Sequence, residues 1–228
     1  MSRVGGIAVQ ADARHAWTSV RDQGTRPTCI ACAVSDAHAH AHGLAHGLSA
    51  EYLFYAGLKR VPSLNHAKGL TLGAADLALR GDGQPNEVEW PYQTTTPNPW
   101  APPSLTTLWY GSLHPCAHHE VVLALQGGTP VLLGLKLVPG FNRVQQSPHV
   151  INTAGTPVGA HSVLGVGLGS SVAGGPIDLV LLRNSWGAGW GKGGYAWLAL
   201  NYLTANLIGS RTLKPLQVPA PVSLPLAA

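Results

Sequence analysis

The chain has 228 residues, of which 45% are hydrophobic and only 11% are charged. The charged fraction lies well below the roughly 25% of typical globular proteins, so a packed core is expected and disorder is excluded. The net charge of +4 comes without any run of Lys and Arg, so we expect no nucleic-acid partner.

The compartment can also be judged from the sequence. The N-terminus carries no sustained apolar segment of the kind found in secretory signals, and no apolar run approaches the roughly 18 residues of a spanning helix. Cys29, Cys32 and Cys116 are too few for a disulfide framework. We expect a chain without a membrane partner that is cytoplasmic as synthesised, with non-classical export left open and the oligomeric state unknown.

The first half of the sequence has helical character after an irregular or extended N-terminal segment, 1–28. Thr28 is a plausible N-cap for the alanine-rich run that follows it. A Pro-, Thr- and Ser-rich stretch, 93–117, predicts a long surface connection. The expected helices cover Cys29 to about His46, the segment from Ser49 to Gly57, and residues 71–81.

In the second half of the sequence the spacing of apolar residues changes from a helical pattern to one typical of strands. A short helix ended by glycines is expected at 119–128, and a proline-rich tail, 215–228, is expected to run extended over the surface. Short apolar runs bounded by Gly, Pro or Asn predict strands at 130–137, 161–169, 177–184 and 194–200. Helices followed by strands indicate an α+β fold with two subdomains.

The chemistry of a thiol nucleophile is suggested by four residues. Cys29 begins a helix, where free N–H groups and the macrodipole favour a thiolate. His161 opens a strand and could act as a base, and Asn184 closes another strand and could orient the imidazole. Gln23, six residues before Cys29, offers an amide for a developing oxyanion.

At these residues the chain resembles the papain-like cysteine peptidase family. The matching stretches are "VRDQGTRPTCIACAVS", "GAHSVLGVGLG" and "RNSWGAGWGKGGYAWL", and with weaker matches the resemblance covers about 18–204. His161 lies 132 residues after Cys29, and Asn184 lies 155 residues after Cys29. Both intervals are close to the spacing of about 130–150 residues in this family. The resemblance implies one papain-like domain, 1–214, with an active-site cleft between its two halves. These halves are a helical subdomain at 15–105 and a β-barrel-like subdomain at 106–214 joined by the N-terminal segment.

The resemblance also implies site residues. Cys29 would be the nucleophile, His161 the general base and then acid, and Asn184 the residue that holds the imidazole. The Gln23 side chain and the Cys29 N–H would form the oxyanion hole, and Trp186 would shield the Asn–His bond. Substrate would contact Gly69, Leu70, Thr71, Gly134 and Ala160, and because none of these is charged an apolar residue is expected two positions before the scissile bond. No metal or organic cofactor is implied.

The local signature at the nucleophile departs from the family. Arg26 stands where the resemblance places a disulfide cysteine, Pro27 replaces a glycine, and Ile30 replaces an aromatic residue. The matching stretches are most similar to a bacterial branch of the family that often lacks these disulfides. Only 28 residues precede Cys29, fewer than the inhibitory propeptide of this family contains. Cleavage efficiency and the means of control are therefore left open.

Other functions remain open at this stage. Cys29 and Cys32 could form a redox couple, although no βαβ context supports one. A non-catalytic papain-like binding module has no need of all four site residues. A thiol enzyme that cleaves or ligates amides in one dedicated target is a closer alternative to a general endopeptidase.

Two histidine clusters have simpler interpretations. His38, His42 and His46 follow helical spacing and predict an exposed polar stripe in preference to a metal site. The stretch "HPCAHHE", 114–120, matches no standard zinc spacing and predicts a loop leading into a helix.

Overall fold

The computed structural model describes residues 3–4, 6–144, 149–152 and 155–217. Its helices are α1 (Cys29–Ala41), α2 (Ala50–Arg60), α3 (Leu72–Gly81), α4 (Val121–Gln126) and α5 (Leu200–Asn206), with short 3₁₀ helices at Arg14–Ala16, His118–Glu120 and Pro139–Arg143. Its strands are β1 (Arg3–Val4), β2 (Ile7–Asp12), β3 (Tyr110–Pro115), β4 (Val131–Leu137), β5 (Val150–Ile151), β6 (Gly159–Ser170), β7 (Leu179–Arg183), β8 (Tyr195–Ala199) and β9 (Leu207–Leu216). None of the described helices is long and apolar enough to cross a membrane.

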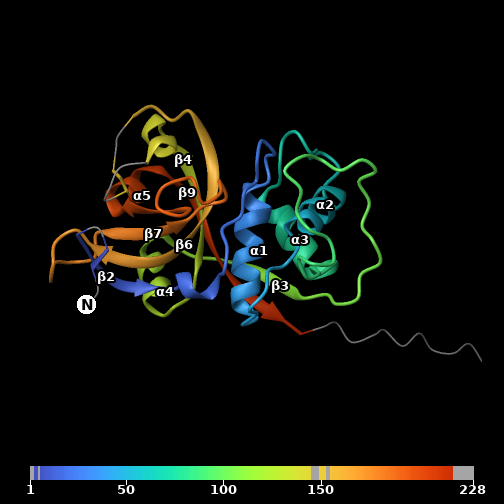
Figure 1. The fold of residues 1–228 in the computed structure, drawn as a ribbon, viewed down its shortest axis with the longest axis horizontal. Helices are drawn as coiled ribbons and strands as arrows, with labels where there is room; N and C mark the ends of the chain where they lie inside the picture. The colour runs from blue at the N-terminus through green and yellow to red at the C-terminus, as the bar shows by residue number, and fades with distance from the viewer. Residues whose placement is uncertain (1–2, 5, 145–148, 153–154, 218–228) are drawn as a thin grey trace, which may run out of the picture.

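The strands within the described ranges form one mixed sheet. Its main path runs β3-β9-β4-β6-β7-β8-β5, and β2 adds to it by pairing with β6. All pairs are antiparallel except β5 with β8. In Figure 1 most of the sheet fills one half of the molecule, α2 and α3 fill the other, and α1 lies between them, while β3 runs below α3.

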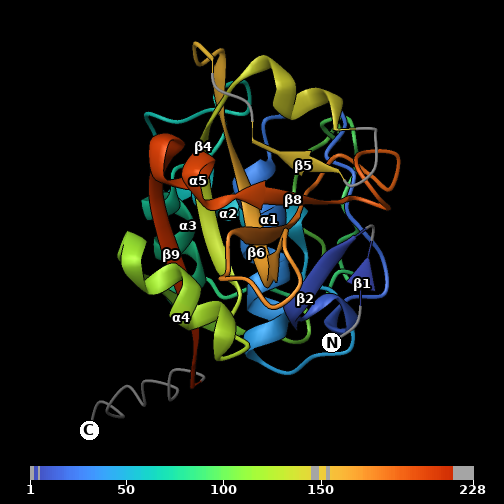
Figure 2. The same cartoon turned by 90° about the vertical axis from the view of Figure 1, so that its left-hand side faces the viewer.

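Successive side chains of the central strands β4 and β6 point alternately into two separate hydrophobic cores. Leu132 and Leu164 pack with α1, α2 and α3, whereas their neighbours Leu133 and Val163 pack in a second core with α4 and α5. Successive strand residues point to opposite faces, so one sheet serves both cores. Figure 2 shows α4 and α5 in front of the sheet and α1 behind it.

The central position of α1 explains its composition. Every residue from Ala31 to Ala39 is buried, and small alanine side chains let other elements approach the helix on all sides. The helix ends at Ala41, earlier than the predicted His46, because Gly43 adopts a left-handed φ of 65° just beyond it.

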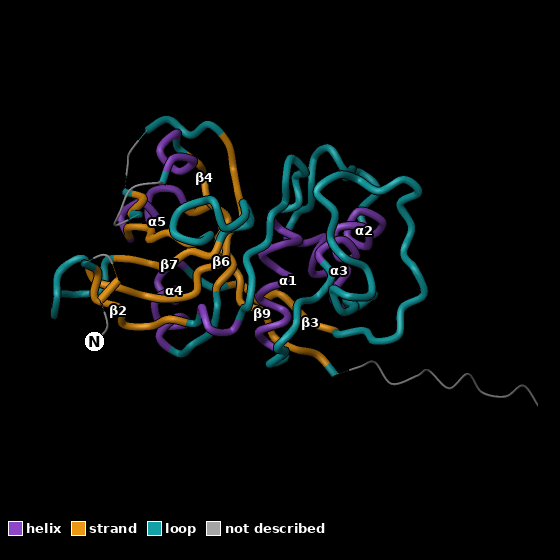
Figure 3. The backbone as a smooth tube through the Cα atoms, viewed as in Figure 1, coloured by secondary structure: helices purple, strands orange, loops and turns teal. Residues whose placement is uncertain are grey.

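The other predicted helices and the four predicted strands are found, and the differences arise where pairing is long-range. Ser49 caps α2 and Thr71 caps α3 through side-chain oxygens, and the four predicted strands are present as β4, β6, β7 and β8. The predicted surface connection is a loop only in its first part (Figure 3), because it ends in β3, which pairs with β9. Strand β9 continues to Leu216, so the predicted tail begins inside the sheet, and its remainder from 218 lies outside the described residues.

Candidate active site

Cys29 is the first residue of α1. Thr28 occupies the N-cap position, but its side chain caps no helix N–H, and Thr28 Oγ1 instead lies 2.6 Å from the Tyr92 hydroxyl. The predicted cap is therefore wrong in its mechanism, because tertiary contact with Tyr92 takes up the hydroxyl. The first-turn amides of α1 stay without a side-chain cap beside the thiol, which favours negative charge there.

The half-buried Cys29 thiol has opposing influences on its pKa. Burial raises the pKa, while the backbone N–H groups of Ser162, Ile30 and Cys29 itself act to lower it. Ser162 directly follows His161 in β6. The influence of the Ser162 amide on the thiol therefore places the start of β6 beside the start of the central helix α1.

His161 and Asn184 form a direct hydrogen bond. His161 Nε2 lies 2.7 Å from Asn184 Oδ1, and the same oxygen accepts the Ser185 N–H at 2.8 Å. An amide oxygen only accepts, so the His161 Nε2–H is the donor. In the neutral imidazole this leaves Nδ1 as the basic nitrogen.

Aromatic side chains enclose this pair. The Trp186 ring stacks on the His161 ring at a centroid distance of 4.5 Å, and Phe141 meets both rings edge-on. Burial disfavours the imidazolium and lowers the pKa of His161 to about 4, against the smaller opposing effect of Asn184. The imidazole is therefore a neutral base at neutral pH.

Gln23 is held in place through Ser185. Gln23 Oε1 accepts the Ser185 hydroxyl at 2.7 Å, and the Gln23 N–H donates to the Ser185 carbonyl at 2.8 Å. Gln23 Nε2 donates to the Arg26 carbonyl at 2.8 Å, which leaves its second N–H for another acceptor. Ser185 therefore links Gln23 to Asn184. Sequence reasoning missed it, although it lies beside Asn184 in the matched stretch.

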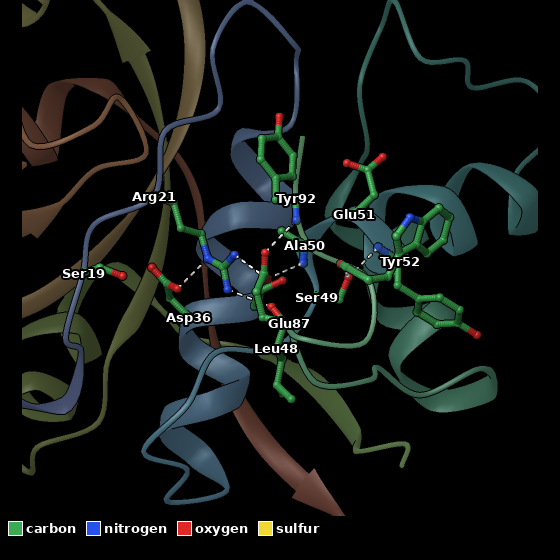
Figure 4. Close-up of polar contacts among 12 residues, drawn as sticks. Ser19, Arg21, Asp36, Leu48, Ser49, Ala50, Glu51, Tyr52, Glu87 and Tyr92 are labelled. Carbon is green, nitrogen blue, oxygen red and sulfur yellow. Dashed lines mark hydrogen bonds and ion pairs between the residues drawn. The ribbon is translucent and has the colours of Figure 1, made fainter. Parts of the chain in front are cut away.

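A buried charge network lies beneath these residues. The Asp36 carboxylate of α1 accepts hydrogen bonds from the Nε–H groups of Arg183, at 2.6 Å, and of Arg21, at 2.8 Å. Arg183 directly precedes Asn184 in the chain. Arg21 also donates to Glu87 and to the Leu48 carbonyl (Figure 4). The helix that carries Cys29 is thus tied to the segments that carry Gln23 and Asn184.

Gly69 lies against the loop before Cys29. It has a left-handed φ of 85°, and a Cβ at this position would lie 2.6 Å from the Pro27 carbonyl oxygen. Leu70 turns its side chain into the helical core against Gly57 of α2. This placement differs from the prediction that the Leu70 side chain shapes a substrate pocket, because the apolar side chain is buried between helices.

The other predicted substrate residues lie on both halves. Gly134 of β4 pairs with Ser162, and Ala160 of β6 is exposed and pairs with Lys136. Thr71 is exposed, and its hydroxyl caps α3 by accepting the Ala74 N–H at 3.1 Å. Contacts of these residues with substrate stay predictions.

The predicted exposed histidine stripe is wrong. His38 is fully buried with its Nδ1 2.8 Å from Gln84 Oε1, and His42 packs edge-on against Trp109, because α1 lies between the two halves. Of the three, His46 is exposed. Within the described ranges no group of three or more His, Cys, Asp or Glu side chains is placed to hold a metal ion.

Comparison with known proteins gives the family. The sequence profile described as "Papain family cysteine protease" matches residues 7–214. The chain belongs to the papain family. It is therefore a cysteine peptidase that acts on peptides or proteins, and its papain-like α+β fold is confirmed. No curated protein sequence matches the chain significantly.

Solved papain-family structures share this fold. Xylellain, a cysteine protease from Xylella fastidiosa, has a TM-score of 0.71 at 20% identity over 94% of this chain and 88% of its own. Digestive procathepsin L 3 of Tenebrio molitor larval midgut has a TM-score of 0.66 at 21% identity over 95% and 71%. The Carica candamarcensis protease CMS1MS2, solved in complex with E-64, has a TM-score of 0.61 at 20% identity over 90% and 95%.

Proposed function

We propose that this peptidase hydrolyses peptide bonds with Cys29 as nucleophile, His161 as general base and acid, and Asn184 as the orienting group. The second Gln23 Nε2–H and the Cys29 N–H would bind the oxyanion. One observation carries the proposal: the His161–Asn184 hydrogen bond lies under Trp186, next to the amide that contacts the Cys29 thiol.

The burial of both reacting groups defines the resting state. A raised thiol pKa and a lowered imidazole pKa favour neutral Cys29 and neutral His161. As Sγ attacks the scissile carbonyl carbon, its proton passes to His161 Nδ1 and the carbonyl oxygen becomes the oxyanion. Collapse breaks the C–N bond, and His161 gives the proton to the leaving nitrogen.

Hydrolysis of the thioester completes the cycle. Water attacks the acyl carbon while His161 Nδ1 takes one of its protons. The C–S bond then breaks, the acid product leaves, and the proton returns to the Cys29 sulfur. Substrate would lie between the two halves of the molecule, as the predicted cleft requires.

The neighbouring cysteine is poorly suited to redox chemistry. Cys32 is 1% exposed, and burial raises its pKa to about 12. A buried, protonated thiol is a slow partner in thiol–disulfide exchange. This disfavours the redox couple.

Site-resolved alkylation tests the assignment. The reduced protein is treated with limiting iodoacetamide at mildly acid pH, and the label is mapped by peptide mass in wild type and in His161→Ala. We expect labelling mainly at Cys29, because His161 stays neutral at this pH and can take the thiol proton during alkylation. We also expect a drop in His161→Ala and protection by E-64, the compound bound to the Carica protease. Slow labelling of all three cysteines, unaffected by His161→Ala, would remove the basis for this mechanism.

Substrate preference needs its own measurement. The uncharged residues Thr71, Gly134 and Ala160 lead us to propose an apolar side chain two positions before the scissile bond. Cleavage of a peptide library with products identified by mass checks this, and dominance of acidic or basic residues there would contradict it. Product analysis on whole proteins separates broad proteolysis from action on one dedicated target.

A further inference from the structure

The Arg26 guanidinium is buried beside the nucleophile. Its Nη1 and Nη2 donate to the two Glu51 carboxylate oxygens at 2.6 and 2.8 Å, and Nη1 also donates to the Gln93 carbonyl at 2.5 Å. The guanidinium carbon lies 5.4 Å from the Phe54 ring centroid and 5.1 Å from that of Tyr92. Arg26 is thus fixed by an ion pair and by two aromatic rings.

The Glu51 carboxylate is buried and accepts hydrogen bonds from groups other than Arg26 as well. Glu51 belongs to the first turn of α2 and is 0% exposed. Besides Arg26, it accepts the Trp100 indole N–H at 2.7 Å and the Gln93 N–H at 3.3 Å. The anchor of Arg26 is therefore a carboxylate fixed at a helix terminus.

The loop of residues 23–28 is held by this anchor. The Arg26 carbonyl accepts the Gln23 Nε2–H, and the Tyr92 hydroxyl donates to the Gln23 carbonyl at 2.9 Å. Because that donation uses the single Tyr92 proton, the Thr28 hydroxyl must donate to Tyr92. Both ends of the loop, at Gln23 and just before Cys29, are thus held by the same side-chain cluster.

We propose that Arg26, clamped by Glu51 and Tyr92, is a positioning residue that aims the free Gln23 amide N–H and the Cys29 N–H at a common point. This rests on the proposed function, in which those two donors bind the oxyanion. Donors fixed before reaction stabilise developing charge far better than donors that must reorganise. All three cysteines are free, so the clamp holds the loop without a covalent bond.

A double-mutant cycle tests the proposal. The variant Arg26→Met with Glu51→Gln removes both charges together, because a lone buried charge would destabilise the fold, and the amide oxygen introduced on α2 can still accept from Trp100. The matched control is Arg60→Met with Asp82→Asn, a partly exposed pair also anchored on α2. The kcat and KM for a peptide substrate are measured in the wild-type and Gln23→Ala backgrounds.

We expect the Arg26/Glu51 variant to lose about tenfold or more in kcat with KM within about twofold. In the Gln23→Ala background the same change should lower kcat by a clearly smaller factor, because only its effect on the Cys29 N–H remains. The control pair should leave kcat unchanged in both backgrounds. Unchanged kcat, or an equal fractional loss in both backgrounds, would overturn the proposal in favour of a purely structural pair.

Two further measurements separate the ways of failing. If Cys29→Ala stays active, the nucleophile is wrong and the proposed function fails by itself. If Cys29→Ala is inactive but Gln23→Ala keeps full kcat, the Gln23 assignment fails and the Arg26 proposal is overturned with it. Should the double variant not fold, Arg26→Lys takes its place in the cycle, because lysine keeps the charge and loses the two-pronged geometry.

Discussion

His161 sits under Trp186 and beside Phe141, and this burial is the cause of its low pKa. A protonated imidazole cannot accept the Cys29 proton. We therefore expect kcat/KM to be lost as pH falls through about 4, where His161 becomes protonated in the folded enzyme.

Removing the Trp186 ring should shift the pH at which kcat/KM is lost on acidification, here called the acid limb of the pH–rate profile. In Trp186→Ala the imidazole gains solvent, so its pKa and the acid limb should rise toward the ordinary value near 6.5. The measurement is a pH–rate profile beside Trp109→Ala, which alters an aromatic residue packed on His42 and away from His161. An acid limb that is the same in both variants would show that Trp186 does not control the His161 pKa.

Gly69 and Gly43 form a matched pair of glycines. Both have left-handed φ, at 85° and 65°, but a Cβ meets the Pro27 carbonyl at Gly69 and nothing within 4 Å at Gly43. Gly43→Ala should lower the free energy of unfolding by about 1–2 kcal/mol through backbone strain alone. Gly69→Ala should show that strain plus displacement of the loop before Cys29, and hence a larger loss of kcat.

Thermal unfolding and peptide-hydrolysis rates of the two variants check this expectation. Equal effects of the two substitutions on kcat would mean that the Pro27 loop tolerates displacement.

At the scale of the elements, Asp36 joins α1 to β7 and to the N-terminal segment. Asp36→Asn leaves the buried guanidinium groups of Arg183 and Arg21 without their shared anion. Breaking a buried pair from one side typically destabilises by about 3–5 kcal/mol. We expect a loss of that order in the free energy of unfolding.

The comparison variant is Asp82→Asn, which breaks a partly exposed pair with Arg60 and should lower stability by about 0–1 kcal/mol. Urea unfolding followed by circular dichroism gives both values. A similar small loss in the two variants would mean that the Asp36 network does not hold the halves together.

At the scale of the whole molecule, two buried histidines couple stability to pH. Burial lowers the pKa of His38 and of His161 to about 4 from the ordinary 6.5. The unfolded chain therefore binds more protons than the folded protein between about pH 6.5 and 4, so stability falls on acidification across that window. Each histidine contributes roughly 3 kcal/mol to the loss.

The variant His38→Gln isolates one of these contributions. It keeps a donor for Gln84 Oε1 but cannot bind a proton, so stability should depend less steeply on pH between 6.5 and 4. Urea unfolding at several pH values measures the slope. An unchanged slope would show that His38 does not titrate differently in the two states.

Local pattern was enough to predict much of this protein. Ser49 precedes α2 and Thr71 caps α3 by bonds that span only three residues, and β4 and β6 are visible as short apolar runs. The stretches around Cys29, His161 and Asn184 were sufficient to indicate the family, because nearby residues preserve the chemistry of each motif.

Only the tertiary structure decided features that depend on distant partners. Strands β3 and β9 escaped prediction because they stabilise each other across about a hundred residues, and Thr28 lost its expected cap to Tyr92. The burial of His38 and the Arg26–Glu51 pair follow from where α1 and α2 pack. The sequence by itself determined the elements and the reactive groups, since these rest on local periodicity and residue chemistry. Packing between segments far apart in the chain sets which side chains are buried together and which loop is clamped.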